Sequence, residues 1–250
     1  MEYLTAGPVC DTAVVFLPGL PGSCESFRAV LGTLAQYAVQ GIAVTLRGFR
    51  PGDAAMSDLS VAHWTQDVRR LLEDHARVRT VVLVAMTQSI PVALQLALVA
   101  PSLVGRIVFV DPALGASGRA SLQQEMIVHK SRNQANWVKH VDKKMVHKPE
   151  DSVLQRLAID LSAGSFPLRV ALCQAALDNN WSQLQALPST TALAVVVGDG
   201  TTVTTVADRS EGVAKWRRSV TTTCIPDCGM LVPVEQPRAL ACAILGLLAL

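Results

Sequence analysis

Three polar residues, Thr87, Gln88 and Ser89, interrupt an otherwise apolar stretch of the chain at a point where a reacting group could lie. The residues before them, 81–85, are all aliphatic, which is typical of a strand buried on both faces of a sheet. Pro91 follows, and proline is favoured in the first turn of a helix, where no N–H donor is needed. The Thr87 hydroxyl would therefore lie at the tip of a strand. A hydroxyl in that place can act as a nucleophile only if a base removes its proton.

Five further candidate residues are similarly placed, because each lies just after a predicted strand. These are Leu20 after 13–17, Phe49 after 41–46, Asp111 after 106–110, and Cys228 and Met230 after 220–225. Open α/β sheets bind ligands at the carboxyl ends of their parallel strands, so the five segments can build one site. Asp111 has two interpretations, a ligand contact or a turn and helix-cap residue, and both stay open.

The elements that must position these residues alternate between strand and helix. Apolar runs predict strands, 191–197 among them, and 3.6-residue periodicity predicts helices over 25–37, 60–75, 91–100, 213–218 and 237–250. Such alternation with short links is typical of an α/β fold, a mostly parallel sheet with helices on both faces. Residues 115–187 are richer in charge and in Gln and Asn, and they read as several helices. We therefore expect a core of 1–114 and 188–250 and a helical lid of 115–187.

Composition limits the partners and the location of the protein. The 250 residues carry a formal charge of +2 with no basic run, so nucleic acid is not an expected partner. The N-terminal residues lack a signal-peptide pattern, and the longest apolar run, 239–250, is too short to span a bilayer. The six cysteines have neither a disulfide-framework nor a zinc-site spacing. We expect a cytoplasmic protein with no metal, no cofactor and no membrane partner.

Four landmarks resemble those of the α/β-hydrolase superfamily, in the same order. They are Pro18-Gly19-Leu20-Pro21-Gly22, Arg47-Gly48, the turn at Thr87, and Gly229-Met230 before Glu235-Gln236-Pro237. The resemblance covers nearly the full length and implies the α/β-hydrolase fold with a helical lid. Within the superfamily the layout is similar to the cofactor-independent dioxygenases, in Phe16-Leu17-Pro18-Gly19, in an acid placed like Asp111 and in an aromatic lid.

The same comparison shows where this chain departs from the family. The family's G-x-S-x-G elbow reads Ala85, Thr87 and Ser89 at its three informative positions. Met230 replaces the histidine base, and Thr201 holds the place of the acid. A thioether cannot accept the proton that the nucleophile must lose. We therefore predict a chain without the Ser-His-Asp triad, for which hydrolysis by the ordinary mechanism is not expected.

Other features of the family site could remain. The resemblance implies that the backbone N–H groups of Leu20 and Gln88 form an oxyanion hole. Thr87 and Cys228 offer further hydrogen bonds to a ligand. Phe49, Met230 and the lid residue Trp137 are expected to line the pocket, although Trp137 could instead pin the lid to the core.

These features suggest an enzyme without a nucleophile. It would isomerise, epimerise, cyclise or eliminate a small, mostly apolar metabolite in a lidded pocket, and natural-product biosynthesis fits by analogy. The ligand would be a small molecule or a modified peptide. A non-catalytic protein that binds a ligand or a partner is one alternative, and a hydrolase with Thr87 as nucleophile and His140 as base is another. The apolar C-terminal helix either packs on the sheet or faces a second copy in a homodimer.

Overall fold

The protein was examined as a computed structural model. It describes residues 1–20, 23–49, 59–75, 77–113, 115–130, 134–150, 166–200 and 220–249, together with 153, 155, 157, 159, 212 and 215.

A seven-stranded sheet crosses the molecule in the order β1-β3-β2-β4-β5-β6-β7. Its strands are β1 Glu2–Ala6, β2 Thr12–Leu17, β3 Gln40–Thr45, β4 Thr80–Met86, β5 Val104–Val110, β6 Ala192–Gly198 and β7 Val220–Ile225. All neighbours pair in parallel except β1, which runs antiparallel to β3 at the edge. The predicted mostly parallel sheet is thus confirmed. No pattern predicted β1, because its side chains are largely exposed and it lies outside the alternating part of the chain.

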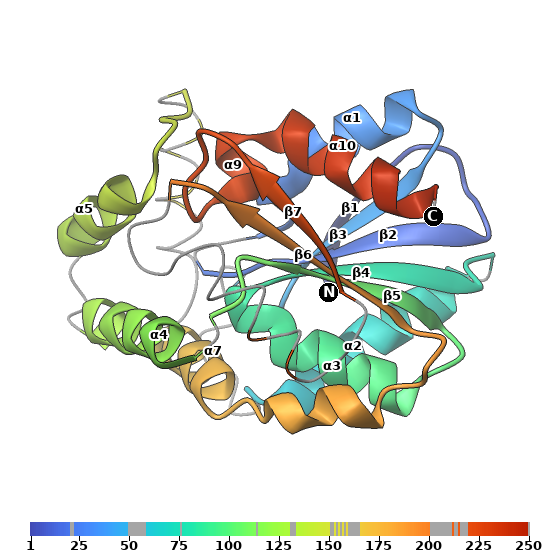
Figure 1. The fold of residues 1–250 in the computed structure, drawn as a ribbon, viewed down its shortest axis with the longest axis horizontal. Helices are drawn as coiled ribbons and strands as arrows, with labels where there is room; N and C mark the ends of the chain where they lie inside the picture. Colours follow the sequence, from blue (N-terminus) through green and yellow to red (C-terminus); the bar gives the residue numbers. More distant parts are fainter. Residues whose placement is uncertain are drawn as a thin grey trace.

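Helices cover both faces of this sheet (Figure 1). On one face lie α1 Arg28–Gln36 and α10 Pro237–Leu248, and on the other lie α2 Val61–Asp74 and α3 Ile90–Val99. Alternate residues of a strand point to opposite faces, so the sheet separates two apolar cores. Val14 and Phe16 of β2 pack on the α1 and α10 side, whereas Val15 and Leu17 pack on the α2 and α3 side. The fully buried Trp64 of α2 belongs to the second core.

The helix boundaries differ from the prediction in a few places. The predicted helix 25–37 is divided into a 3-10 turn, η1 Cys24–Phe27, and α1. α3 begins one residue before Pro91, which lies in its first turn as expected. A short helix, α9 Val232–Glu235, precedes α10 and was not predicted. The predicted helix 213–218 lies almost wholly outside the described residues.

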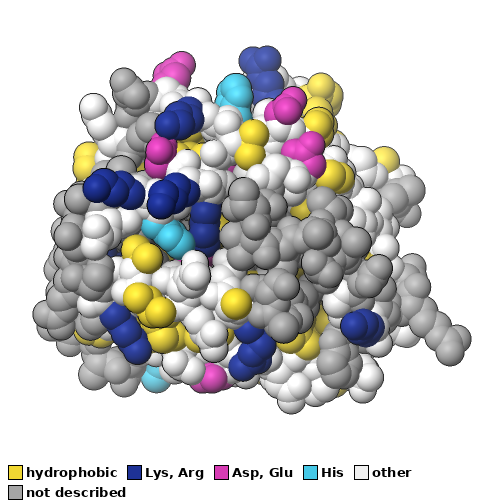
Figure 2. All heavy atoms as spheres, turned by 60° about the vertical axis from the view of Figure 1, so that its left-hand side comes forward, with side chains coloured by type: hydrophobic (Ala, Val, Ile, Leu, Met, Phe, Trp, Pro, Cys, Tyr) yellow, Lys and Arg dark blue, Asp and Glu magenta, His cyan; other side chains and the backbone are white. Residues whose placement is uncertain are grey.

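Between β5 and β6 the chain forms α4 Gly115–Lys130, α5 Gln134–Lys144, α7 Phe166–Leu177 and a 3-10 segment, η4 Trp181–Ala186. α4 and α5 lie beyond one end of the sheet, on the left of Figure 1. The last turn of α5 carries Lys143 and Lys144, whose positive charges complement the partial negative charge of a helix C-terminus. Figure 2 shows lysine and arginine side chains gathered around a histidine where this side comes forward. The division into core and lid stays a prediction.

Within the described part of the chain, no helix is both long and apolar enough to cross a membrane. The six cysteines are free thiols.

Candidate functional site

The turn that carries Thr87 joins β4 directly to α3 through a 3-10 turn, η3 Thr87–Ser89. Among the described non-glycine residues, positive φ angles occur at Ala38, Asp111 and Asp227. Thr87 therefore does not adopt the left-handed backbone, and the strained residue of this region is Asp111 at the end of β5, with φ of 48°.

Both hydroxyls of the turn donate to strand-end carbonyls. The Thr87 Oγ1 donates to the carbonyl of Asp111 at 2.6 Å, and the Ser89 Oγ donates to that of Leu17 at 2.9 Å. Thr87 and Ser89 are buried. The Asp111 N–H in turn donates to the Val196 carbonyl at 2.9 Å. The polar groups of the turn thus connect β4 to its neighbours β2 and β5, and Asp111 connects β5 to β6.

The backbone N–H of Leu20, the expected oxyanion donor, has a protein partner. It donates to the Gln88 Oε1 at 3.1 Å. Gly19 makes this approach possible, because a Cβ at that position would meet the same oxygen at 2.5 Å. The side chain of Gln88 therefore lies where the oxygen of a bound carbonyl group would lie.

A buried ion pair from the helices between β5 and β6 completes the site. The Gln88 Nε2 donates to the Glu125 Oε2 of α4 at 2.6 Å. The Glu125 Oε1 accepts from the Lys144 Nζ of α5 at 2.7 Å, and the two side chains are 6% and 9% exposed. Lys144 also donates to Ser121 Oγ at 3.3 Å and to Met230 Sδ at 3.6 Å. No sequence pattern pointed to Glu125 or Lys144, because single charges on polar helices are typical of solvent-facing residues.

The loop after β7 brings Met230 and Cys228 to the same place. Met230 donates its N–H to the Lys144 carbonyl at 3.3 Å. The buried Glu235 carboxylate supports this loop by accepting from the N–H groups of Gly229 and Leu231 at 2.9 and 3.0 Å. Burial, reinforced by nearby carboxylates, raises the pKa of the Cys228 thiol, which therefore stays protonated and is a poor nucleophile.

His140, from α5, lies beside this network without joining it. Its buried Nε2 atom has no hydrogen-bond partner within the described residues. Burial, assisted by the charge of Lys144, lowers the pKa of His140, which favours the neutral ring. In the described part of the chain, no imidazole hydrogen-bonds to the Thr87 hydroxyl.

The other two predicted pocket residues are Phe49 and Trp137. Phe49 is buried in the core on the α2 and α3 side of the sheet. Trp137 belongs to α5, but its side chain lies outside the described residues, as does Thr201. The described residues also contain no group of three His, Cys, Asp or Glu side chains placed to hold a metal ion.

The network leaves little free space. A cavity of about 10 Å³ lies among Leu20, Glu125, His140, Lys144 and Met230, which is room for about one water molecule. A cavity of about 540 Å³ lies nearby, between η1, the start of α10 and the segment that follows α5. A ligand can accept a hydrogen bond from the Leu20 N–H in place of Gln88 only if the Gln88 side chain moves.

Comparison with known proteins identifies a family model and solved structures that this chain resembles. A family model described as "Alpha/beta hydrolase family" matches residues 14–243. No curated protein matches the chain in sequence.

Solved structures match over nearly the whole chain. An esterase from Exiguobacterium antarcticum has a TM-score of 0.83 at 13% identity, with 100% of this chain and 94% of that one covered. An enol-lactonase from Burkholderia xenovorans LB400 has a TM-score of 0.79 at 12% identity, with 100% and 96% covered. A bromoperoxidase from Bacillus anthracis has a TM-score of 0.77 at 14% identity, with 99% and 94% covered. At such identities the likeness shows the fold alone.

Proposed function

Because this chain belongs to the alpha/beta hydrolase family, we propose that it uses the family's fold for a reaction other than hydrolysis. The reaction moves a proton at a carbon atom next to a carbonyl group of a small, mostly apolar metabolite. Isomerisation, epimerisation, cyclisation and elimination share this step. A setting in natural-product biosynthesis is part of the proposal and rests on analogy.

The observation that supports this chemistry best is the position of the Gln88 carboxamide. Its oxygen accepts from the Leu20 N–H, and its nitrogen donates to the Glu125 carboxylate. A substrate carbonyl that displaced this amide would accept from the same N–H. The carbon next to that carbonyl would then take the place of the amide nitrogen, which now lies 2.6 Å from the Glu125 Oε2.

The residues divide the proton transfer between them. Glu125 takes the proton, the C–H electron pair moves to the carbonyl oxygen, and the Leu20 N–H stabilises the enolate oxygen. The Lys144 ammonium balances the charge of Glu125 and orients its carboxylate at 2.7 Å. In isomerisation or epimerisation the proton returns to another or the same carbon of the substrate. In cyclisation it goes to the oxygen of the carbonyl that the enolate carbon attacks, and in elimination it leaves with the departing group. Each reaction therefore balances in protons and electrons without a cofactor.

Solvent exchange of a simple ketone tests the proposal. Wild-type protein in D₂O should speed deuterium incorporation next to the carbonyl of 2-decanone or cyclohexanone, followed by NMR. Glu125→Gln should slow this exchange by about 10²–10⁴-fold, the usual contribution of a general base. Glu73→Gln is the matched control, because Glu73 lies on α2 in an exposed pair with Arg69.

The variant Gln88→Ala tests whether the Gln88 side chain competes with the ligand for the Leu20 N–H or only supports the structure. Removal of the amide that occupies the Leu20 donor should tighten ketone binding, because the ligand no longer has to displace it. Exchange at the buffer rate with both the wild type and Gln88→Ala, for every ketone tried, would refute the proposal.

A specific observation favours a second candidate, a non-catalytic protein that binds a ligand or a partner. The space beside Glu125 is only about 10 Å³, and the protein's own groups occupy the Leu20 N–H and the Thr87 hydroxyl. This candidate predicts that a ligand raises the thermal unfolding temperature without exchange or turnover. Opening of the site by Gln88→Ala would then give binding without chemistry.

A further inference from the structure

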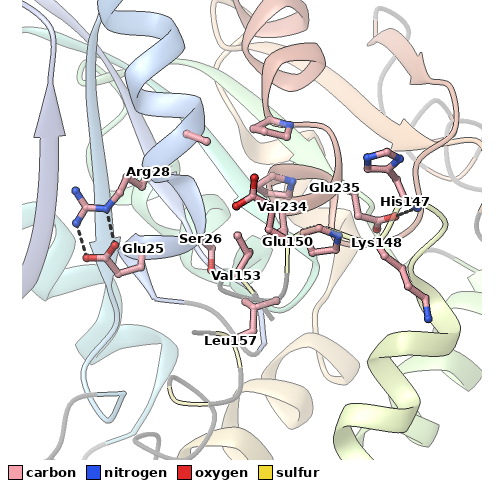
Figure 3. A pocket seen from close by; sticks show the side chains of 14 residues that line it. Glu25, Ser26, Arg28, His147, Lys148, Glu150, Val153, Leu157, Val234 and Glu235 are labelled. Atoms are coloured by element: carbon pink, nitrogen blue, oxygen red, sulfur yellow. Dashed lines mark hydrogen bonds and ion pairs between the residues drawn. The ribbon is translucent and has the colours of Figure 1, made fainter. Parts of the chain in front are cut away.

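The cavity of about 540 Å³ near the site has no role in the chemistry described so far. Its volume of about 540 Å³ falls within the range of small-molecule sites, roughly 300–1,000 Å³. Apolar side chains, among them Val153, Leu157 and Val234, line its middle. Figure 3 shows Ser26 beside Val153 and Leu157, with Glu25 and Arg28 to one side and His147 and Lys148 to the other.

The cavity leads towards Leu20 through shared walls. A cavity of about 10 Å³ at Gly19, Leu20 and Met86 shares four wall residues with the large one, namely Ser26, Leu157, Pro233 and Val234. This small cavity shares Leu20 and Leu231 with the one beside Glu125 and Lys144. The three spaces therefore follow one another from the large cavity to the carboxylate.

An unpaired hydroxyl lies at the junction. The Ser26 Oγ is buried and has no hydrogen-bond partner within the described residues, and Ser26 lines both the large and the small cavity. Buried polar side-chain atoms in native proteins usually have a partner, so this one indicates a group supplied by a ligand.

Two cationic side chains that line the cavity are already paired. Arg28 makes two contacts of 2.7 Å with Glu25, and Lys148 lies 2.8 Å from Asp142. A charged ligand would have to compete with these carboxylates or ammonium groups. The pairing of these two cations therefore favours a neutral ligand over an anionic one.

We propose that this cavity is a binding subsite for the apolar body of a neutral, elongated ligand. An oxygen of the ligand accepts a hydrogen bond from Ser26 at the narrow end of the cavity. The step from Ser26 to Leu20, where a carbonyl end would react, rests on the proposed function. The substrate class that follows is a neutral carbonyl compound that carries a second acceptor oxygen for Ser26 and an apolar tail.

Two probes test the subsite: 2-decanone, which has an acceptor oxygen, and butylbenzene, which has none. Their affinities for the full-length protein are measured by isothermal titration calorimetry. Ser26→Ala should weaken 2-decanone binding about fivefold, the value of one ordinary hydrogen bond, and leave butylbenzene binding unchanged.

A cavity-filling variant tests the location. Ala29 is an exposed residue of α1 that lines the cavity, so Ala29→Trp should weaken both probes at least about tenfold by occupying their space. Gln36→Trp adds the same indole to the exposed end of α1, away from the cavity, and should bind both probes like the wild type. Equal binding by the two tryptophan variants would overturn the proposal, as would equal weakening of both probes by Ser26→Ala.

The outcome is distinguishable from that of the proposed function. Binding with this pattern and no C–H exchange would retain the subsite and remove the proton-transfer chemistry. Exchange that Ala29→Trp leaves at wild-type KM and kcat would retain the chemistry and remove the subsite.

Discussion

Replacement of Glu125 by leucine should destabilise the protein strongly, because it leaves a buried ammonium group without its counterion. The Lys144 side chain is 9% exposed, and its remaining contacts would be Ser121 and the Met230 sulfur. Removal of one partner of a buried ion pair costs about 3–5 kcal/mol. The contact to Ser121 places the expected loss near the lower end, at about 3 kcal/mol.

A double-mutant cycle isolates the pair. Lys144→Met alone should cost about 3 kcal/mol as well, since the Glu125 carboxylate would keep Gln88 as its remaining hydrogen-bond donor. The double variant Glu125→Leu/Lys144→Met buries no charge and leaves chiefly the Gln88 amide unpaired, at a cost of about 1–2 kcal/mol. The double variant should therefore cost about 4 kcal/mol less than the two single effects added together.

Urea unfolding followed by tryptophan fluorescence measures these free energies. The control is the exposed pair Arg69–Glu73, with side chains 51% and 57% exposed, where Glu73→Leu should change stability by about 0.5 kcal/mol or less. The reasoning is refuted if Glu125→Leu costs no more than Glu73→Leu, or if the effects of the two single variants simply add.

Three further predictions concern other groups at the site. Burial lowers the pKa of His140 in the folded state, so the unfolded chain binds the proton more readily. The free energy of unfolding should therefore fall as pH falls below about 6.5, by up to about 1.4 kcal/mol per pH unit. Urea unfolding at pH 7.5 and 5.5 should show a smaller loss of stability in His140→Gln than in the wild type, and an equal loss would contradict this. Because burial raises the pKa of Cys228, iodoacetamide at pH 8 should label the exposed Cys242 and spare Cys228 in the folded protein, as read by mass spectrometry; labelling of both would show that the loop opens. Thr87→Val should cost about 1–2 kcal/mol by removing the bond to the Asp111 carbonyl, and a fluorophosphonate should not label the wild type; labelling at Thr87 would instead support the hydrolase alternative.

Part of the fold follows from local patterns that are visible in the chain. The aliphatic run 81–85 predicts a central strand, and β4 lies between β2 and β5 in the middle of the sheet. Pro91 predicts the start of a helix, and α3 has proline in its first turn. Strand and helix periodicities depend on which face of one element is buried, so neighbouring residues are sufficient to detect them. β1 was missed because an exposed edge strand carries no such burial signal.

The sequence by itself also predicted a site at the carboxyl ends of the strands and revealed the departures from the family pattern at Thr87 and Met230. The tertiary structure decided what occupies that position. The Gln88 side chain bonds Leu20, 68 residues earlier, and Glu125, 37 residues later. Lys144 reaches the same carboxylate from another helix. Such pairings depend on how helices outside the sheet pack against its end, and no spacing along the chain encodes that distance, so the polar network appears only once the elements are assembled.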